Sequence, residues 1–432
     1  MTTNGTNNAQ VDEELASAFR QHLPDLTSPR FVKTAQQSPY EYSEAFQQKQ
    51  HPPWLYRLTK AWEDLLEDPF QGVTIDGTVR QGVYKKEDFQ GASIDKIVQA
   101  TNTALGQLNS EQSKKVRYPL NAKQWRCWSN PEFLLRPFGL RLEELPEETA
   151  QSILGVLEAT FSKQGYQKAL AAIRINHFLG EVCKVPRIMN QYSYNFLLFG
   201  EPSTDKPWGW SLYGHHLCLN VYLHGSQIVI SPYFTGAEPN LIDEGPWKGT
   251  QILHTQGDLG LRLMQSLPKE KQQIVQTYKL MRDPKMLQSG DLKVDRWNQD
   301  DQRHLCGAFR DNRVVPYEGV KVSEMTAEQQ DIVLEIADEF LLYYPDETRQ
   351  KQKQQIKKHF EETYFSWIGG YGDHDAFYYR IQSPVIVLEF DHHSGVFLAN
   401  TEPAKFHTHT ICRMPNAGDY GQALRDEQDR LQ

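Results

Sequence analysis

Two stretches of this chain resemble each other, and that likeness restricts the fold more than any other feature. Residues 143–161 read EELPEETAQSILGVLEATF, and residues 323–340 read SEMTAEQQDIVLEIADEF. Each has Glu followed by Leu or Met, then a polar stretch typical of a helix start, then Ile-Leu or Val-Leu at the same spacing. Pro146 suits the first turn of one helix, and Thr326 is expected to cap the other. The sequence therefore predicts two helices of one kind.

An aromatic segment containing glycine follows each of these helical regions. These segments are YNFLLFGEPS at residues 194–203 and YFSWIGGYGD at residues 364–373. Each is followed by aromatic and β-branched residues typical of paired strands, over residues 208–234 and 377–400. The predicted fold class is therefore α+β, with helices packed on a largely antiparallel sheet.

The two matching regions predict an internal duplication. We expect two related units, each a helical region followed by a β-hairpin, at about residues 143–235 and 323–415. Chance similarity between amphipathic helices is the alternative explanation. Residues 1–12 are predicted to be a disordered tail, and residues 13–432 a single large domain. Residues 284–318 are polar without a clear period and predict a long loop.

Composition excludes several classes of protein. The 432 residues are 39% hydrophobic with a net charge of −9 and no long basic run, so no nucleic-acid partner is expected. No run of about 18 apolar residues occurs, so no membrane partner is expected. Five scattered cysteines and no secretory signal pattern predict a reducing, cytoplasmic location. Neither a P-loop nor a G-x-G-x-x-G motif occurs, so no nucleotide cofactor is expected.

Several short motifs carry a resemblance to a known family. They are FGEPS, PWGWSLYGHHLCLN, LEFDH, ANTEP, HTHTICR and PNAGDYG. From about residue 55 onward the chain resembles the family catalogued as domain of unknown function 3500. The resemblance implies one large domain and brings no activity with it. The residues that match the motifs are Gly200, Glu201, Pro202, Trp208, Gly209, Trp210, Gly214, His215, His216, Asn220, Glu389, Asp391, His407, His409, Arg413, Asp419, Tyr420 and Gly421. Cys218 departs from the small hydroxyl residue expected there.

The paired histidines of the HHLCLN motif are expected to enter a strand. Side chains two residues apart share one face of a strand. His216 would then share a polar face with Asn220, which predicts that both point into a pocket or to solvent. His215 would share a face with aliphatic residues and is expected to hydrogen-bond a main-chain carbonyl in the core.

The segment FHTHTICR contains the strongest candidate ligands. His407 and His409 lie on one face of a predicted strand, about 7 Å apart at Cα, with Arg413 further along the same face. Two imidazoles that project the same way suit two ligands of one transition-metal ion. The interpretation without a metal is an acid–base or anion-binding surface, where His409 and Arg413 hold a substrate carboxylate.

The neighbouring strand VIVLEFDHH offers carboxylates on one face. Glu389 and Asp391 share that face, and a buried carboxylate needs a cation or strong donors. Exposure to solvent is the alternative for this pair. His392 and His393 are expected at a solvated turn.

These residues predict an enzyme that acts on a small organic molecule. One ion of Fe, Cu or Zn would be held by the metal ligands His216, His407, His409 and Glu389. Catalytic roles fall to Glu389, Arg413 and Asn220. An oxidoreductase is favoured because two histidines and a carboxylate suit metal activation of dioxygen. The alternatives are a zinc-dependent or metal-free hydrolase or lyase, and a non-catalytic binding or scaffold protein with structural histidines.

Overall fold

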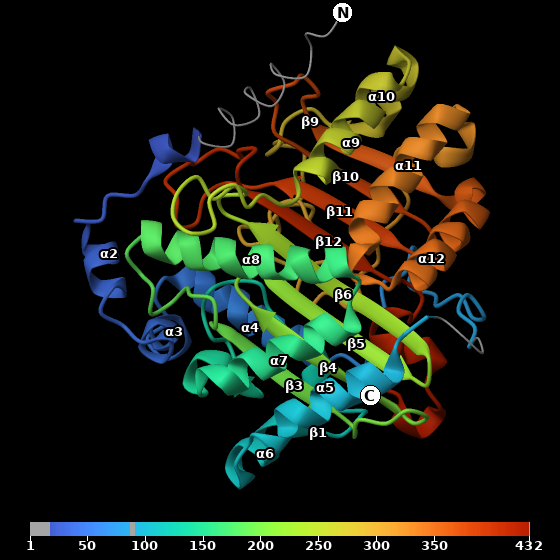
Figure 1. Cartoon of the computed structure of the whole chain (residues 1–432). Helices are drawn as coiled ribbons and strands as arrows, with labels where there is room; N and C mark the ends of the chain where they lie inside the picture. The colour runs from blue at the N-terminus through green and yellow to red at the C-terminus, as the bar shows by residue number, and fades with distance from the viewer. Residues whose placement is uncertain (1–17, 87–90, 432) are drawn as a thin grey trace, which may run out of the picture.

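The computed structural model describes residues 18–86 and 91–431 of the chain (Figure 1). The tail expected at residues 1–12 lies outside the described residues. None of the described helices is long and apolar enough to cross a lipid bilayer.

A single mixed sheet of twelve strands forms the centre of the fold. Its strand order is β1-β3-β4-β5-β6-β12-β11-β10-β9-β7, with β2 added beside β3 and β8 beside β9. The pairs β1–β3 and β7–β9 are parallel, and the other pairs are antiparallel. The prediction of an α+β fold with a largely antiparallel sheet is therefore confirmed. The strands are β1 (Arg117–Tyr118), β2 (Leu140–Arg141), β3 (Tyr194–Phe199), β4 (Pro207–Gly214), β5 (Leu217–His224), β6 (Gln227–Ala237), β7 (Gln276–Tyr278), β8 (Val320–Lys321), β9 (Tyr364–Gly369), β10 (Phe377–Gln382), β11 (Val387–His392) and β12 (Thr408–Arg413).

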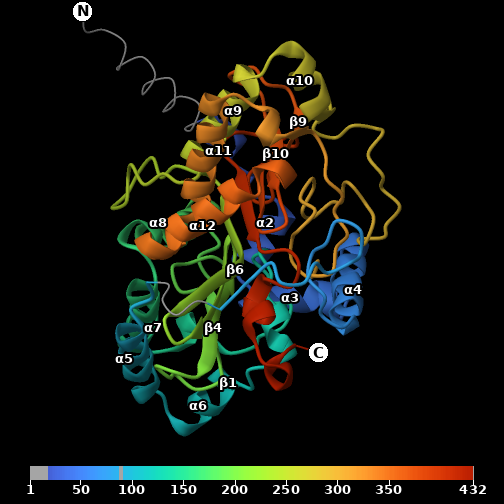
Figure 2. The ribbon, with the colours of Figure 1, turned by 90° about the vertical axis from the view of Figure 1, so that its right-hand side faces the viewer.

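Most of the helices cover one face of the sheet. Figure 2 shows α5, α7, α8, α9, α11 and α12 on one side, with α3, α4 and the C-terminal segment on the other. The helices are α2 (Pro29–Thr34), α3 (Pro39–Gln47), α4 (Pro53–Glu67), α5 (Ile94–Gly106), α6 (Ser110–Val116), α7 (Glu147–Thr160), α8 (Lys163–Val182), α9 (His254–Ser266), α10 (Lys269–Val275), α11 (Ala327–Phe340) and α12 (Asp346–Lys358).

Alternation along the strands divides the core into two layers. Leu219 and Leu388 face the helices, in a cluster with the buried faces of α7, α8 and α11. Phe234 and Ile411 face the other side, in a cluster that includes Trp62 of α4. Neighbouring residues of a strand point to opposite faces of the sheet. Each face is covered by one of the two clusters, so both faces are buried.

The same order of elements occurs before each set of four long strands. A short strand and a 3-10 turn precede α7, α8 and β3 to β6, and likewise α11, α12 and β9 to β12. Thr326 caps α11 through a capping box with Gln329, as expected. Pro146 is at the N-cap of α7, one position before the expected first turn, and makes no side-chain cap. The two sets meet at the centre of the sheet, where β6 pairs with β12.

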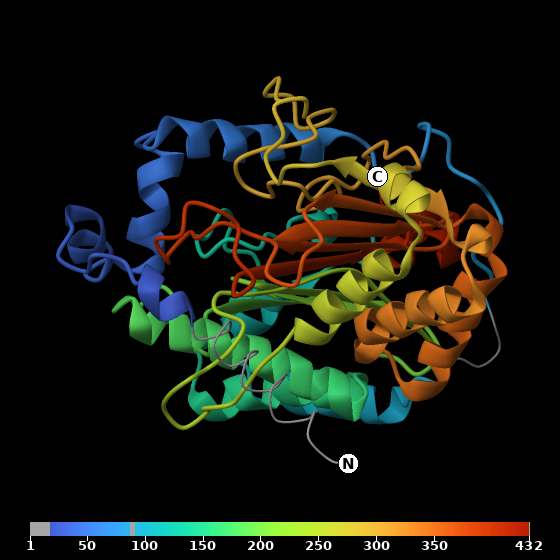
Figure 3. The ribbon, with the colours of Figure 1, turned by 90° about the horizontal axis from the view of Figure 1, so that it is seen from above.

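The long loop predicted at residues 284–318 is confirmed, because no helix or strand lies between β7 and β8. The loop crosses the face opposite the helices, beside α4 (Figure 3). Several of its polar side chains are buried, and Asp301, Arg303, His304 and Asp311 are each at most 1% exposed. The loop therefore encloses polar groups against the sheet.

Candidate metal centre

The paired histidines form the turn between two strands. His215 and His216 join β4 to β5, with Gly214 opposite Leu217 in the register. The expectation that they enter the strand is corrected, because β5 begins at Leu217. His216 has a φ of 60°, which turns its side chain away from the course of the strand. Its carbonyl oxygen accepts a 2.8 Å hydrogen bond from the N–H of Gly236, so the turn is held against β6.

Three imidazoles converge at this point. The Nε2 atom of His409 lies 3.0 Å from Nε2 of His407 and 3.1 Å from Nε2 of His216. All three ligand atoms lie within 4.8 Å of one another, and the three side chains are buried. Only this group among the described residues gathers three or more potential metal ligands so closely. The structure thus brings together three of the four predicted ligands: His216 from the β4–β5 turn, His407 just before β12 and His409 within β12.

A glycine makes room for the three rings. Gly236 of β6 is opposite His409 in the register. A Cβ atom at position 236 would lie 2.9 Å from Cδ2 of His216 and 3.0 Å from Cδ2 of His409. Any larger residue would push the rings apart, so Gly236 belongs to the site although the motifs did not single it out.

Burial sets the charge of the three rings. Loss of hydration lowers the pKa of His216, His407 and His409 well below the usual value, and repulsion among the neighbouring imidazoles lowers it further. The rings are therefore neutral near pH 7. A neutral imidazole offers one lone pair, which is the form that binds a metal.

The outer nitrogens of the three rings are poorly satisfied. Nδ1 of His216 and Nδ1 of His409 have no hydrogen-bond partner among the described residues. Nδ1 of His407 lies 3.7 Å from Oε1 of Glu238. Metal-bound histidines commonly direct the other ring nitrogen at a carboxylate or carbonyl. Glu238 is in a position to serve His407 in this way.

Sequence patterns did not identify Glu238. It directly follows β6, and its Oε1 accepts hydrogen bonds from the N–H groups of Val396, Phe397 and Leu398. Its Oε2 has no partner among the described residues. Burial raises the pKa of Glu238 to about 7, even though these hydrogen bonds lower it. Alternation from Phe234 through Gly236 could have placed it on this face.

Two more histidines surround the triad of His216, His407 and His409. His393 stacks on His409 with ring centroids 4.3 Å apart, and His304 lies nearly parallel to His409 at 6.0 Å. The expectation of a solvated turn for His392 and His393 is corrected, because His392 is the last residue of β11 and the two side chains are 4% and 2% exposed. The ring nitrogens of His393 lie 2.9 Å from the carbonyl oxygens of Ser394 and Asp300. The loop at residues 284–318, called the covering loop below, therefore packs over this side of the triad.

Glu389 does not join the triad. Glu389 is opposite Ile411 in the register, which is two residues further along β12 than His409. Its carboxylate accepts hydrogen bonds from the N–H groups of Leu305 and Cys306, each at 2.8 Å, and from the Tyr378 hydroxyl at 2.6 Å. Burial would raise the pKa of Glu389, but these donors and His304 hold it below its usual range. Glu389 was predicted to be a metal ligand, but its carboxylate is instead hydrogen-bonded to main-chain N–H groups of the loop.

Asp391 is also engaged by the loop. It is opposite His409, and Arg303 grips both of its oxygens at 2.6 and 3.0 Å. The sequence left open whether Glu389 and Asp391 are buried beside strong donors or exposed to solvent. Both are buried.

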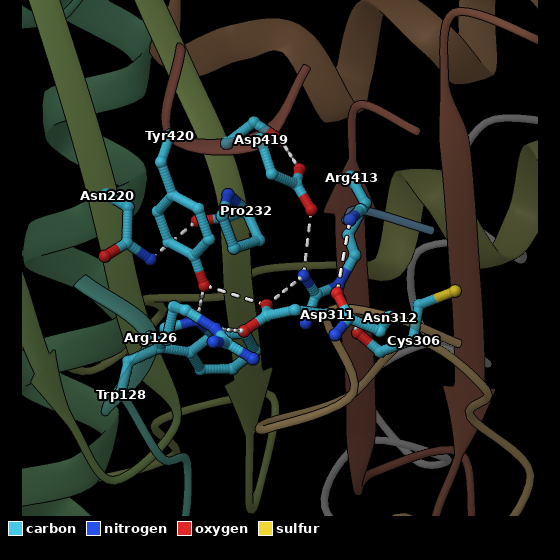
Figure 4. A network of polar contacts seen from close by, with 12 residues as sticks. Arg126, Trp128, Asn220, Pro232, Cys306, Asp311, Asn312, Arg413, Asp419 and Tyr420 are labelled. Atoms are coloured by element: carbon cyan, nitrogen blue, oxygen red, sulfur yellow. Dashed lines mark hydrogen bonds and ion pairs between the residues drawn. The ribbon is translucent and has the colours of Figure 1, made fainter. Parts of the chain in front are cut away.

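Asn220 and Arg413 lie in hydrogen-bonded positions apart from the triad. Asn220 accepts from the Ser211 hydroxyl at 2.6 Å and donates to the carbonyl of Pro232 at 2.9 Å. Arg413 donates to Asp311 and Asp419 at 2.7 and 2.8 Å (Figure 4). It also donates to the carbonyl oxygens of two loop residues, Cys306 and Gly307, at 2.7 Å.

Comparison of the sequence with models of known protein families gave a match. The model described as a protein of unknown function, DUF3500, matches residues 90–422. The chain belongs to the DUF3500 family. All three histidines of the triad fall inside the matched region, whereas α2, α3 and α4 precede it. Neither the curated proteins nor the solved structures gave a match.

His215, also within the DUF3500 region, packs as a core residue. Its Nδ1 lies 2.8 Å from Oδ1 of Asn176 on α8, so its partner is a side-chain amide instead of the expected carbonyl. Its ring stacks on His216 with centroids 3.8 Å apart. Burial lowers the pKa of His215 to about 3, so this ring is neutral and supports the position of His216.

Proposed function

We propose that this chain binds one transition-metal ion through Nε2 of His216, His407 and His409, and that it is a metal-dependent enzyme acting on a small organic molecule. The convergence of three buried, neutral imidazoles carries this proposal. A neutral ring can donate only one proton, so three Nε2 atoms cannot all be satisfied by one another. A metal ion accepts all three lone pairs at once.

Three protein ligands leave coordination positions open for a substrate, as in catalytic metal sites. Imidazole suits iron, copper and zinc. An oxidoreductase that activates dioxygen is our leading class, because the three ligands are buried and dioxygen is a small apolar molecule able to enter such a site.

A zinc-dependent hydrolase or lyase is the second candidate. The converging ligands include no carboxylate, and three histidines with an open position also suit catalytic zinc, which activates water. The opposing class is a binding or scaffold protein in which the histidines are structural.

Metal analysis of protein purified without a histidine tag tests the proposal. We expect about one Fe, Cu or Zn per chain, and a large loss of metal in His409→Ala with the fold retained. His374→Ala is the matched control, because His374 is exposed on the surface. A wild-type protein that binds no metal, or full occupancy in His409→Ala, would leave the histidines as structural residues. Anaerobic spectra with and without oxygen separate iron or copper from zinc.

We also propose that the two sets of elements are related units, at about residues 143–235 and 323–415. The repeated order of elements supports this proposal. A superposition by one rotation tests it, and a difference in connectivity or handedness would defeat it. The triad would then combine His216 of one unit with His407 and His409 of the other.

A cytoplasmic location is likewise a proposal. All five cysteines are buried and unpaired, which supports a reducing compartment. Fractionation of the native cells, with detection of the untagged protein, tests it.

A further inference from the structure

The covering loop and β10 contain buried guanidinium nitrogens that lack a hydrogen-bond partner among the described residues. They include Nε and Nη2 of Arg296, Nε of Arg313 and Nη1 of Arg380. Arg310 also has Nε and Nη2 without a hydrogen bond, but its Nη2 pairs with Asp301 at 3.3 Å. Both ring nitrogens of His304 lack a hydrogen bond among the described residues as well. The side chains of Arg296, Arg313, Arg380 and His304 are at most 8% exposed. Buried donors are almost always paired in folded proteins, so this group points to a ligand.

Arg296, Arg380 and His304 lie around Tyr378 and Glu389, and Arg313 is close enough for its charge to interact with those of Arg296 and Glu389. The guanidinium of Arg296 lies over the ring of Tyr378, 5.1 Å from its centroid. The Tyr378 hydroxyl donates to Glu389, and Arg380 is opposite Glu389 in the register. Nδ1 of His304 lies 3.9 Å from the same carboxylate.

The positive charges at this point exceed their acidic partners. Arg380 pairs with Glu318 at 2.8 Å. Arg296 and Arg313 form no ion pair within 4 Å with any described carboxylate. Burial, together with repulsion from Arg310 and Arg296, lowers the pKa of Arg313 to about 10, which leaves it charged at pH 7. Arg296 donates to the carbonyl oxygen of Arg303, and Arg313 donates to those of Leu292 and Asp295. Burying a cation without an acidic partner is costly even so, and a bound anion would offset part of that cost.

We propose that Arg296, Arg313 and Arg380 bind an oxyanion group, a carboxylate or a phosphate, of the small-molecule substrate. Guanidinium groups match the geometry of both anions. The link to catalysis rests on the proposed metal function, whereas anion binding itself does not.

The arginines and the triad lie on either side of β11. Arg380 of β10 is opposite Glu389, and His409 of β12 is opposite Asp391, two residues further along β11. The two places are therefore separated by about 7 Å along the strands and by two strand spacings, about 10 Å, across them. His304 lies between the two places, near Tyr378 on one side and His409 on the other. Its unpaired nitrogens are placed to contact the same ligand.

Titration of the purified chain with sodium phosphate and with sodium succinate tests the inference, with sodium chloride at equal ionic strength as the reference. We expect a saturable rise in Tm with at least one of the two anions, and the lower Kd identifies the class of oxyanion. Arg296→Met should weaken that binding roughly ten- to hundredfold, because it removes charge-assisted hydrogen bonds. Arg262→Met is the matched control on the surface of α9, and it should bind the anion like the wild type.

Three results would overturn the inference: no effect of either anion beyond that of chloride, unchanged anion affinity in Arg296→Met, or an equal loss in Arg262→Met. If Arg296→Met does not fold, Arg296→Lys replaces it and should bind about tenfold more weakly, because lysine lacks the planar fork.

Metal content separates this inference from the proposed function. Arg296→Met should keep its metal, and His409→Ala should lose metal but keep the anion response. Full metal in His409→Ala defeats the metal proposal alone, and loss of the anion response in that variant defeats the separate anion site.

Discussion

Two polar clusters lie at opposite ends of β12, and they differ in how completely their hydrogen bonds are satisfied. At the end of the strand, Arg413 makes four hydrogen bonds within the protein. Its partner Asp311 also accepts from Arg126 and Tyr420, each at 2.9 Å (Figure 4). This cluster needs nothing from outside the chain.

The cluster at the start of β12 is incomplete. His407, His409 and His216 direct three Nε2 atoms at one another, and Nδ1 of each ring has no hydrogen-bond partner within residues 18–86 and 91–431. Both clusters are almost fully buried. Burial of polar residues therefore does not distinguish a site from a structural network, whereas incomplete hydrogen bonding does.

The largest effect is expected from a substitution in the complete cluster around Arg413. Asp311→Ala leaves Arg126 and Arg413 as buried cations with one partner fewer, and should lower the free energy of unfolding by about 3–5 kcal/mol. Metal content should not change. Urea denaturation and elemental analysis measure both quantities. A loss of metal in this variant would show that the two clusters are coupled.

Metal removal should have the next largest effect, and it concerns the incomplete cluster. With free metal at 100 times its Kd, binding stabilises the folded chain by about 2.7 kcal/mol. A chelator should therefore lower the Tm of the wild type and leave that of His409→Ala unchanged. Equal responses of the two proteins would place the metal elsewhere.

Gly236→Ala tests the space within the incomplete cluster. The added methyl group would press on His216 and His409, so we expect the free energy of unfolding to fall by about 1–2.5 kcal/mol, together with weaker metal binding. Gly106→Ala at the end of α5 is the control, because nothing lies within 4 Å of a Cβ atom there. Normal metal affinity in Gly236→Ala would show that the rings can move apart and still bind.

His215→Ala should have the smallest effect. It removes the hydrogen bond to Asn176 and should cost about 1–2 kcal/mol. Metal binding should persist, because His215 supports the ring of His216 without joining the triad. Thermal unfolding beside elemental analysis checks this, and loss of all metal would make His215 part of the site.

Local patterns predicted much of the fold. Alternation grouped the aliphatic residues after His215 on one face of their strand, and Leu219 of that face packs in the core on the helix side. The polar loop before β8 was expected from its lack of a period. His407 and His409 were expected to project together because residues two apart share a face of a strand. These inferences succeed because each depends on a few neighbouring residues.

The same reasoning missed contacts made by the loop. Glu389 was expected on the metal, but the main-chain N–H groups of Leu305 and Cys306 bind it. No side-chain pattern reveals where the main chain of an irregular loop donates its hydrogen bonds. The sequence patterns also failed to identify His304 and Glu238 as neighbours of the triad. The residues that surround each of them come from distant parts of the chain.

The sequence by itself determined the α+β class, membership of the family and the shared direction of His407 and His409. The sequence also proposed His216 as a third ligand, but only the tertiary structure shows how its ring reaches the other two. That meeting requires β6 to pair with β12, which brings Gly236 between two histidines 193 residues apart. Strand alternation is a property of one segment, whereas strand order depends on packing of the whole chain, so only the folded sheet selects which histidines meet.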